Sequence, residues 1–152
     1  MVVGALSCAV LTSCAGSSAA GSIPPPRSVI DTMTFAPSLA VDLSSFTRTK
    51  AGAYYRDVVR GSGDVAALNR TLTLKYAVAL PNGTPVEAQT TPADILFDHS
   101  VIRGWREGIP GMRAGGRRLI IVPPELGYGR VRYGSVPPGS TLVFDIELLK
   151  VR

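Results

Sequence analysis

The most constraining feature of this sequence is the stretch TLTLKYAVAL at 71–80, in which large apolar residues alternate with smaller or polar ones. Its large residues are Leu72, Leu74, Tyr76, Val78 and Leu80. A period of two places these side chains on one face of a half-buried β-strand. The tripeptide PNG follows at 81–83, and Asn and Gly tolerate the positive φ angles of tight hairpin turns. We therefore expect a hairpin whose return strand begins near Thr84.

Three further segments have the composition of strands: AYYRDVV at 53–59, RRLIIV at 117–122 and TLVFDIELLKV at 141–151. The third alternates apolar with polar residues, and its apolar positions are Leu142, Phe144, Ile146 and Leu148. The 16 glycines and 12 prolines of the chain favour many turns and few long helices. Short strands joined by turns pair most simply in an antiparallel sheet.

The best helix candidate is VIRGWREGIPGM at 101–112, which contains the single tryptophan of the chain. Its apolar residues are spaced three, four and three apart and so share one face: Ile102, Trp105, Ile109 and Met112. Glycines weaken this helix, and Pro110 ends or kinks it because proline cannot donate to the carbonyl of Arg106. The predicted fold class is therefore α+β, a twisted antiparallel β-sheet wrapped around one short α-helix.

The sequence lacks the patterns of nucleophilic, metal or phosphate chemistry. It contains no nucleophile elbow, no ligand cluster at metal spacing and no glycine-rich phosphate loop, and its single histidine, His99, stands alone. We therefore expect no metal and no cofactor. The net charge of +5 comes from basic residues that are spread out, except at 113–118 and 130–132, which indicates a solvated surface and no nucleic-acid partner.

Residues 1–14 have the pattern of a lipoprotein-type signal segment. The run VVGALSCAVL at 2–11 is apolar but too short to span a membrane. It leads into LTSC at 11–14, which resembles the bacterial lipobox and implies lipidation of Cys14. No Lys or Arg precedes the run, although a positive start is expected of a signal, so an apolar tail is the alternative.

The rest of the chain divides into three parts. Residues 15–27 are rich in small residues and proline and predict a flexible tether. Residues 28–52 contain apolar positions without a sustained period, which predicts an N-terminal arm. We expect four arm residues to pack along the domain: Phe35, Leu39, Val41 and Leu43. Residues 53–152 form the folded domain.

Three segments of the domain carry a family resemblance: VIRGW, GMRAGGRRLIIVPPELGYG and PPGSTLVFDIELLKV. In this order and near this spacing they closely resemble FKBP-type peptidyl-prolyl cis-trans isomerases, over residues 53–152. The arm is similar to the leader of exported bacterial members. The resemblance implies an FKBP-like sheet around a short helix and proline-containing polypeptides as partners, and it makes inhibition by the family's macrolides an expectation.

The resemblance also implies which residues surround a proline pocket. It places Trp105 on the floor, where the alternative from the residues alone is a purely structural core tryptophan. Around it the family pattern matches Tyr76, Val101, Ile102, Tyr128, Val136 and Phe144. The backbone N–H of Ile102 and the hydroxyl of Tyr128 are implied as donors to substrate carbonyls, which would fix the peptide while its proline is buried.

The chain departs from the family pattern at three places. Val86 and Glu87 in GTPVEA stand where the family has a pocket phenylalanine and an aspartate, which predicts a several-fold to tenfold lower rate. The segment TPADILFDHS at 91–100 replaces a family segment with two aromatics, and the spacing leaves open whether Ile95, Leu96 or Phe97 faces the pocket. The loop between Tyr128 and Pro137 is one residue short.

These observations predict a prolyl isomerase with catalytic residues Tyr76, Glu87, Ile102, Trp105, Tyr128 and Phe144. It would act on exported proteins, held by lipid on Cys14 in the bacterial cell envelope, on the periplasmic side or the outer membrane. Two alternatives stay open. One is a peptide-binding chaperone or scaffold that has kept the groove but lost useful catalysis, and the other is a surface lipoprotein without peptide affinity.

Overall fold

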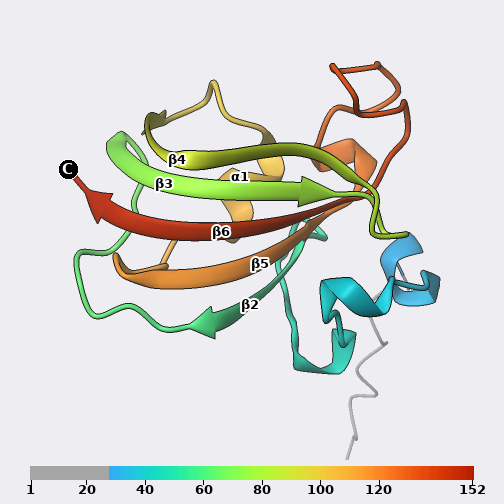
Figure 1. Cartoon of the computed structure of the whole chain (residues 1–152), viewed down its shortest axis with the longest axis horizontal. Coiled ribbons are helices and arrows are strands. Elements are labelled where there is room, and N and C mark those ends of the chain that lie inside the picture. The colour runs from blue at the N-terminus through green and yellow to red at the C-terminus, as the bar shows by residue number, and fades with distance from the viewer. Residues whose placement is uncertain (1–27) are drawn as a thin grey trace, which may run out of the picture.

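The computed structural model describes residues 28–152 and contains one six-stranded sheet. Its strands are β1 (Thr47–Arg48), β2 (Tyr54–Val59), β3 (Arg70–Ala79), β4 (Pro85–Phe97), β5 (Gly116–Val122) and β6 (Leu142–Val151). Their order across the sheet is β1-β2-β5-β6-β3-β4, and every neighbouring pair is antiparallel (Figure 1). The predicted strands and the hairpin at 81–83 are confirmed to within two residues.

The single α-helix of the described chain, α1 (Arg103–Gly108), lies against one face of the sheet (Figure 1). The chain leaves the helix just before Pro110, as the missing N–H of proline requires, yet Ile109 and Met112 continue the buried stripe at 0% and 2% exposure. Helix and sheet enclose one apolar core that includes Leu74, Trp105 and Phe144. The predicted α+β class is confirmed.

Two glycines let α1 approach the sheet closely. A Cβ atom on Gly104 would lie 2.4 Å from a methyl carbon of Val122, and one on Gly108 would lie 2.7 Å from a methyl carbon of Ile120. No side chain fits at those distances. The glycines that weaken the helix in isolation are therefore what allows it to seat against β5.

The arm packs on the opposite face of the sheet through three 3₁₀ turns, η1 (Val29–Thr32), η2 (Pro37–Leu39) and η3 (Leu43–Ser45). Ile30 is fully buried and forms a second apolar cluster with Tyr54, Ile121 and Val143. The arm residues packed around this cluster are Phe35, Leu39, Val41, Leu43 and Phe46. The predicted packing of the arm is thus confirmed, and it explains why β5 and β6 have apolar residues on both faces here.

Strand β4 is an edge strand whose ladder with β3 is interrupted twice. Val78 pairs with Glu87 and Ala79 pairs with Pro85, so Val86 is an extra residue without a partner. A second irregularity follows where Tyr76 pairs with Gln89. The segment at 91–100 that replaces the family pattern is largely strand, because β4 continues to Phe97.

The predicted signal segment, its Cys14 and the tether lie outside the described residues. Within residues 28–152, no helix is both long and apolar enough to cross a membrane.

Candidate active site

A cavity of about 270 Å³ opens between α1, β4 and the loop after β5. Its lining is Tyr76, Glu87, Ile95, Ser100, Val101, Ile102, Trp105, Tyr128, Tyr133 and Phe144. Seven residues predicted for the site are in this lining: Tyr76, Glu87, Val101, Ile102, Trp105, Tyr128 and Phe144. Two others, Val86 and Val136, are not. The structure therefore brings residues from β3, β4, β6, α1 and the β5–β6 loop to one place.

Trp105 forms the base of the cavity and is only 6% exposed. Its indole meets the ring of Tyr76 at 5.3 Å and the ring of Phe144 at 5.6 Å, both in edge-to-face geometry. Edge-to-face contacts are favoured by the aromatic quadrupole and fix ring orientation. Trp105 therefore belongs both to the core and to the lining of the cavity.

Tyr76 and Glu87 form the polar edge of the cavity. The Tyr76 hydroxyl donates to the Oε1 atom of Glu87 at 2.6 Å. Burial, followed by this hydrogen bond to a carboxylate, raises the pKa of the Tyr76 phenol. The phenol is consequently a neutral donor at physiological pH, and the longer glutamate at this position still reaches its tyrosine.

Two further donors belong to lining residues and have no acceptor among residues 28–152: the hydroxyl of Tyr128 and the backbone N–H of Ile102. Burial raises the pKa of the Tyr128 phenol, with smaller contributions from Glu87 and Tyr133. The Tyr128 ring stacks on the ring of Tyr133 with centroids 4.2 Å apart and an interplanar angle of 5°. The stack fixes the ring, and with it the direction in which its hydroxyl can donate.

The two predicted residues outside the lining have structural positions. Val136 is 3% exposed and packs in the main core, while Val86 packs against that core from the bulge of β4. The wall left open by the sequence is occupied by Ile95, because Phe97 is fully buried and Leu96 is 53% exposed and points elsewhere.

Ser100 and Tyr133 line the cavity and were not predicted. Both lie in turns, where no periodicity indicates which way a side chain points. The aromatic character of Tyr133 in a loop of otherwise polar and small residues was the one available signal.

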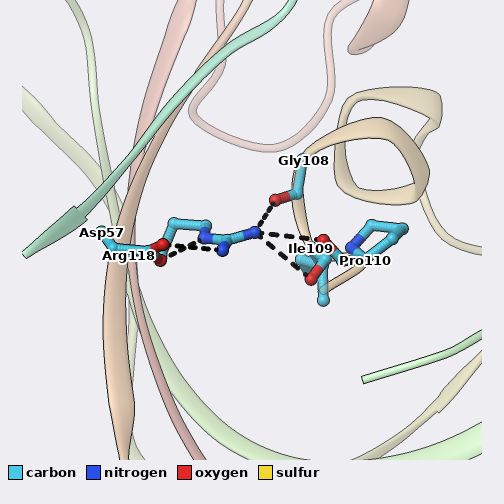
Figure 2. A network of polar contacts seen from close by, with 5 residues as sticks. All are labelled: Asp57, Gly108, Ile109, Pro110 and Arg118. Carbon is cyan, nitrogen blue, oxygen red and sulfur yellow. Dashed lines mark hydrogen bonds and ion pairs between the residues drawn. The ribbon is translucent and has the colours of Figure 1, made fainter. Parts of the chain in front are cut away.

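A buried arginine fixes the end of α1. Arg118 is 3% exposed and forms a paired contact with Asp57, at 2.6 Å and 3.1 Å. Its remaining amino group donates to the carbonyls of Gly108 at 2.8 Å and Pro110 at 3.2 Å (Figure 2). These carbonyls are ones that helix termini leave without partners. The arginine thus ties α1 to β2 and β5.

The cavity has the chemistry of a binding pocket for a small apolar ring. Its walls are mostly aromatic or aliphatic, and its lining residues include hydroxyl and backbone donors. Within residues 28–152, no three His, Cys, Asp or Glu side chains are arranged to hold a metal ion. The arrangement can bury an apolar group and orient an adjacent peptide through two donors.

A six-stranded antiparallel sheet closed over one short helix, with an aromatic cavity floored by tryptophan, defines the class of FKBP-like domains. The family model of the FKBP-type peptidyl-prolyl cis-trans isomerase matches residues 63–149. The chain belongs to this family.

Relatives and solved structures agree with this assignment. The chain is 37% identical over 107 residues to a probable FKBP-type peptidyl-prolyl cis-trans isomerase of Haemophilus influenzae, a match that covers 68% of this chain and 44% of that protein. It is 39% identical to an FK506-binding protein of Neisseria meningitidis, over 66% of this chain and 96% of that one. The crystal structure of FkpA from Escherichia coli superposes with a TM-score of 0.68 at 32% identity, covering 76% of this chain and 55% of that chain.

The match thus spans less than half of the Haemophilus protein but almost all of the Neisseria protein. The family-model match at 63–149 includes β3, β4 and β5 and all but the last two residues of β6.

Proposed function

We propose that this chain catalyses cis–trans isomerisation of X-Pro bonds, with the prolyl ring in the cavity above Trp105. The observation that carries the proposal is the convergence of Tyr76, Trp105 and Phe144 on one open cavity, whose lining residues also include two donors without an acceptor in the described chain. A pyrrolidine ring is small and apolar, which suits a hollow of this size and lining.

The mechanism needs neither an acid nor a nucleophile. Amide resonance gives the X-Pro bond a rotation barrier of about 18–20 kcal/mol. In the twisted transition state this resonance is lost and the carbonyl carries less negative charge, so an apolar cavity binds the twisted form in preference to the planar ones. The Ile102 N–H and the Tyr128 hydroxyl hold the flanking carbonyls, and each tenfold acceleration requires about 1.4 kcal/mol of such preference.

A single hydroxyl offers the sharpest test of this site. Tyr128→Phe keeps the ring that stacks on Tyr133 but removes the proposed donor, so kcat/KM in a proline-limited refolding assay should fall by about two- to tenfold. The matched variant Tyr133→Phe keeps the same stack and should leave kcat/KM within about twofold. An unaltered rate in Tyr128→Phe would remove this residue from the proposal, and no catalysis by the wild-type chain would remove the activity.

A binding module without useful catalysis is the second candidate, and Val86 and Glu87 are what suggested it. The cavity argues against it, since its lining does not include Val86 and Glu87 still accepts from Tyr76. We therefore expect the double variant Val86→Phe/Glu87→Asp to change kcat/KM by less than about threefold, the effect of one weak contact. A gain of tenfold or more, with unchanged peptide affinity, would favour the binding module.

We also infer that the chain is exported and held in the bacterial cell envelope by lipid on Cys14, with residues 15–27 as its tether, 28–52 as its arm and 53–152 as its catalytic domain. The lipobox-like LTSC and the preceding apolar run support this. Incorporation of labelled fatty acid into the wild-type chain, and its loss in Cys14→Ser, would test the anchor. Proline-containing polypeptides are the proposed clients, and macrolides of the type named for the Neisseria relative are proposed inhibitors.

A further inference from the structure

The start of β4 is the part of the sheet that its own ladder holds least well. Pro85 has no N–H to donate, and Val86 is a bulge residue without a partner on β3. Glu87 follows directly, at the edge of the sheet, and its carboxylate must reach Tyr76. Contacts from outside the β3–β4 ladder would therefore help to hold residues 85–87 in place.

The arm supplies a contact at the tip of the same hairpin, where Figure 1 shows the two segments side by side. The backbone N–H of Ala36 donates to the carbonyl of Pro81 at 2.7 Å. Gly83 has a φ of +87°, and a Cβ atom there would lie 3.0 Å from the Ser38 hydroxyl and 3.1 Å from the Ala36 Cβ. The turn is thus both bonded to the arm and in close contact with it.

The arm is itself fixed to a different strand. Arg56 on β2 donates to the carbonyl of Ala40 at 3.1 Å and to the hydroxyl of Ser45 at 3.2 Å, and its guanidinium lies 5.2 Å from the centre of the Phe46 ring. Ile30 is buried at the other end of the arm. The hairpin therefore contacts the arm, which is fixed to β2 independently of β3.

Glu87 lies between the arm and the cavity. It lines the cavity together with Tyr76, and it also borders a hollow of about 400 Å³ on the outer face, whose other wall includes Ser38, Leu39 and Ala40. Residues 81–87 connect the turn that contacts the arm to this carboxylate.

We propose that residues 36–38 of the arm are a positioning element of the proline site: they hold the β3–β4 hairpin so that Glu87 stays bonded to Tyr76. The proposal rests on the proposed function for its effect on rate. Its effect on the hairpin is independent of any activity.

The variant Ala36→Pro tests the contact. Ala36 has a φ of −63°, which proline adopts, and the substitution replaces the N–H that donates to Pro81 with a ring carbon that cannot donate. Ala36→Gly keeps that N–H and is the matched control. The readout is amide hydrogen exchange at Leu80, whose N–H bonds to Thr84 in the hairpin, compared with Arg152, whose N–H bonds to Thr71 at the far end of β3.

We expect Ala36→Pro to accelerate exchange at Leu80 by about two- to tenfold, the factor that one hydrogen bond is worth, and to leave Arg152 unchanged. Unaltered exchange at Leu80, or equal acceleration at both amides, overturns the proposal. If Ala36→Pro fails to fold, Gly83→Ala applies the same test by steric contact, with Gly111→Ala as control for the positive φ, since a Cβ there meets nothing.

A second measurement asks whether the arm acts through Glu87. Ala36→Pro should lower kcat/KM by about two- to tenfold in the wild-type chain and have no further effect in the Glu87→Ala background, which has no acceptor for Tyr76. An equal loss in both backgrounds means that the arm acts through general stability, which overturns the positioning role. A wild-type chain without isomerase activity would refute the proposed function, while exchange at Leu80 would still decide the role of the arm.

Discussion

The phenol of Tyr76 joins the apolar and polar parts of the candidate site. Its ring packs edge-on against Trp105, and its hydroxyl donates to Glu87. Burial and the neighbouring carboxylate both disfavour the phenolate, which raises the pKa of this group. Tyr76 thus lines the cavity and makes the free energy of unfolding depend on pH in the alkaline range.

We predict that the free energy of unfolding falls as pH rises above about 10, the ordinary pKa of tyrosine. Below that pH the phenol is protonated in both states, and its contribution is complete. Above it the unfolded chain releases the proton first, so stability is lost as pH rises toward the elevated pKa of the folded state. The free energy of unfolding, measured by urea denaturation, should therefore fall less steeply above pH 10 in Tyr76→Phe than in the wild type. Equal slopes above pH 10 would contradict the prediction.

Most of the candidate site could be predicted from the sequence because its residues lie in segments that match the family pattern. The pattern around Trp105 and the strand with Tyr76 identified the floor and one wall. Ile95 could not be chosen from its neighbours, because the irregular pairing in β4 disturbs the alternation that reports facing direction. Tyr133 lies in a turn, where no period exists to be interpreted.

At the scale of elements, the two neighbouring arginines of β5 play different parts. Arg117 forms an exposed pair with Asp145 at 2.6 Å, with its side chain 53% exposed. Arg118 points to the other face, with its side chain 4% exposed, and bonds to Asp57 and to the Gly108 carbonyl at the end of α1. Alternation along a strand requires such opposite placement, but the sequence does not state which of the two is buried.

Arg118→Met should lower the free energy of unfolding by about 3–5 kcal/mol, because it leaves Asp57 and the carbonyls of Gly108 and Pro110 without a partner. Arg117→Met is the matched control and should cost less than about 1 kcal/mol, as exposed pairs do. Urea denaturation of both variants measures the difference. Similar losses in the two would show that the Figure 2 network does not hold the helix.

Gly104 provides a prediction in which two effects have opposite signs. Helix propensity alone favours Gly104→Ala by about 1 kcal/mol. A Cβ atom at this position would lie 2.4 Å from the stiff side chain of Val122, and overpacking of this kind costs about 1–3 kcal/mol. We expect net destabilisation, together with weaker peptide binding because neighbouring Trp105 is displaced. A more stable variant in urea denaturation would refute this.

The elements themselves followed from the sequence where one face is buried. Alternation predicted β3 and β6, and the three-four-three spacing predicted α1 with its end before Pro110. The second half of β4 could not be predicted as strand, because an edge strand with largely exposed residues shows no alternation. The order of strands across the sheet was not predicted, since periodicity says nothing about which strands are neighbours.

At the scale of the whole molecule, the sheet has an apolar surface on each face. The helix side holds the main core, and the arm side holds the cluster around Ile30. The arm is therefore a structural part of the domain, although it lies outside the residues matched by the family model.

Ile30→Ala should lower the free energy of unfolding by about 2–5 kcal/mol, the usual cost of emptying a fully buried isoleucine site. Val29, its neighbour, is 70% exposed, and Val29→Ala should change stability by less than about 0.5 kcal/mol. Thermal and urea unfolding of the pair distinguish a packed arm from one that merely lies nearby. Equal stabilities for both variants would mean the latter.

Strand β6, the last of the described strands in the sequence, occupies the middle of the sheet, where it pairs with β5 on one side and β3 on the other. Without it, the strands before it form two groups that share no ladder. During synthesis, a nascent chain therefore carries two incomplete half-sheets until the ten residues of β6 have left the ribosome. Assembly of the complete sheet must therefore wait for translation of β6.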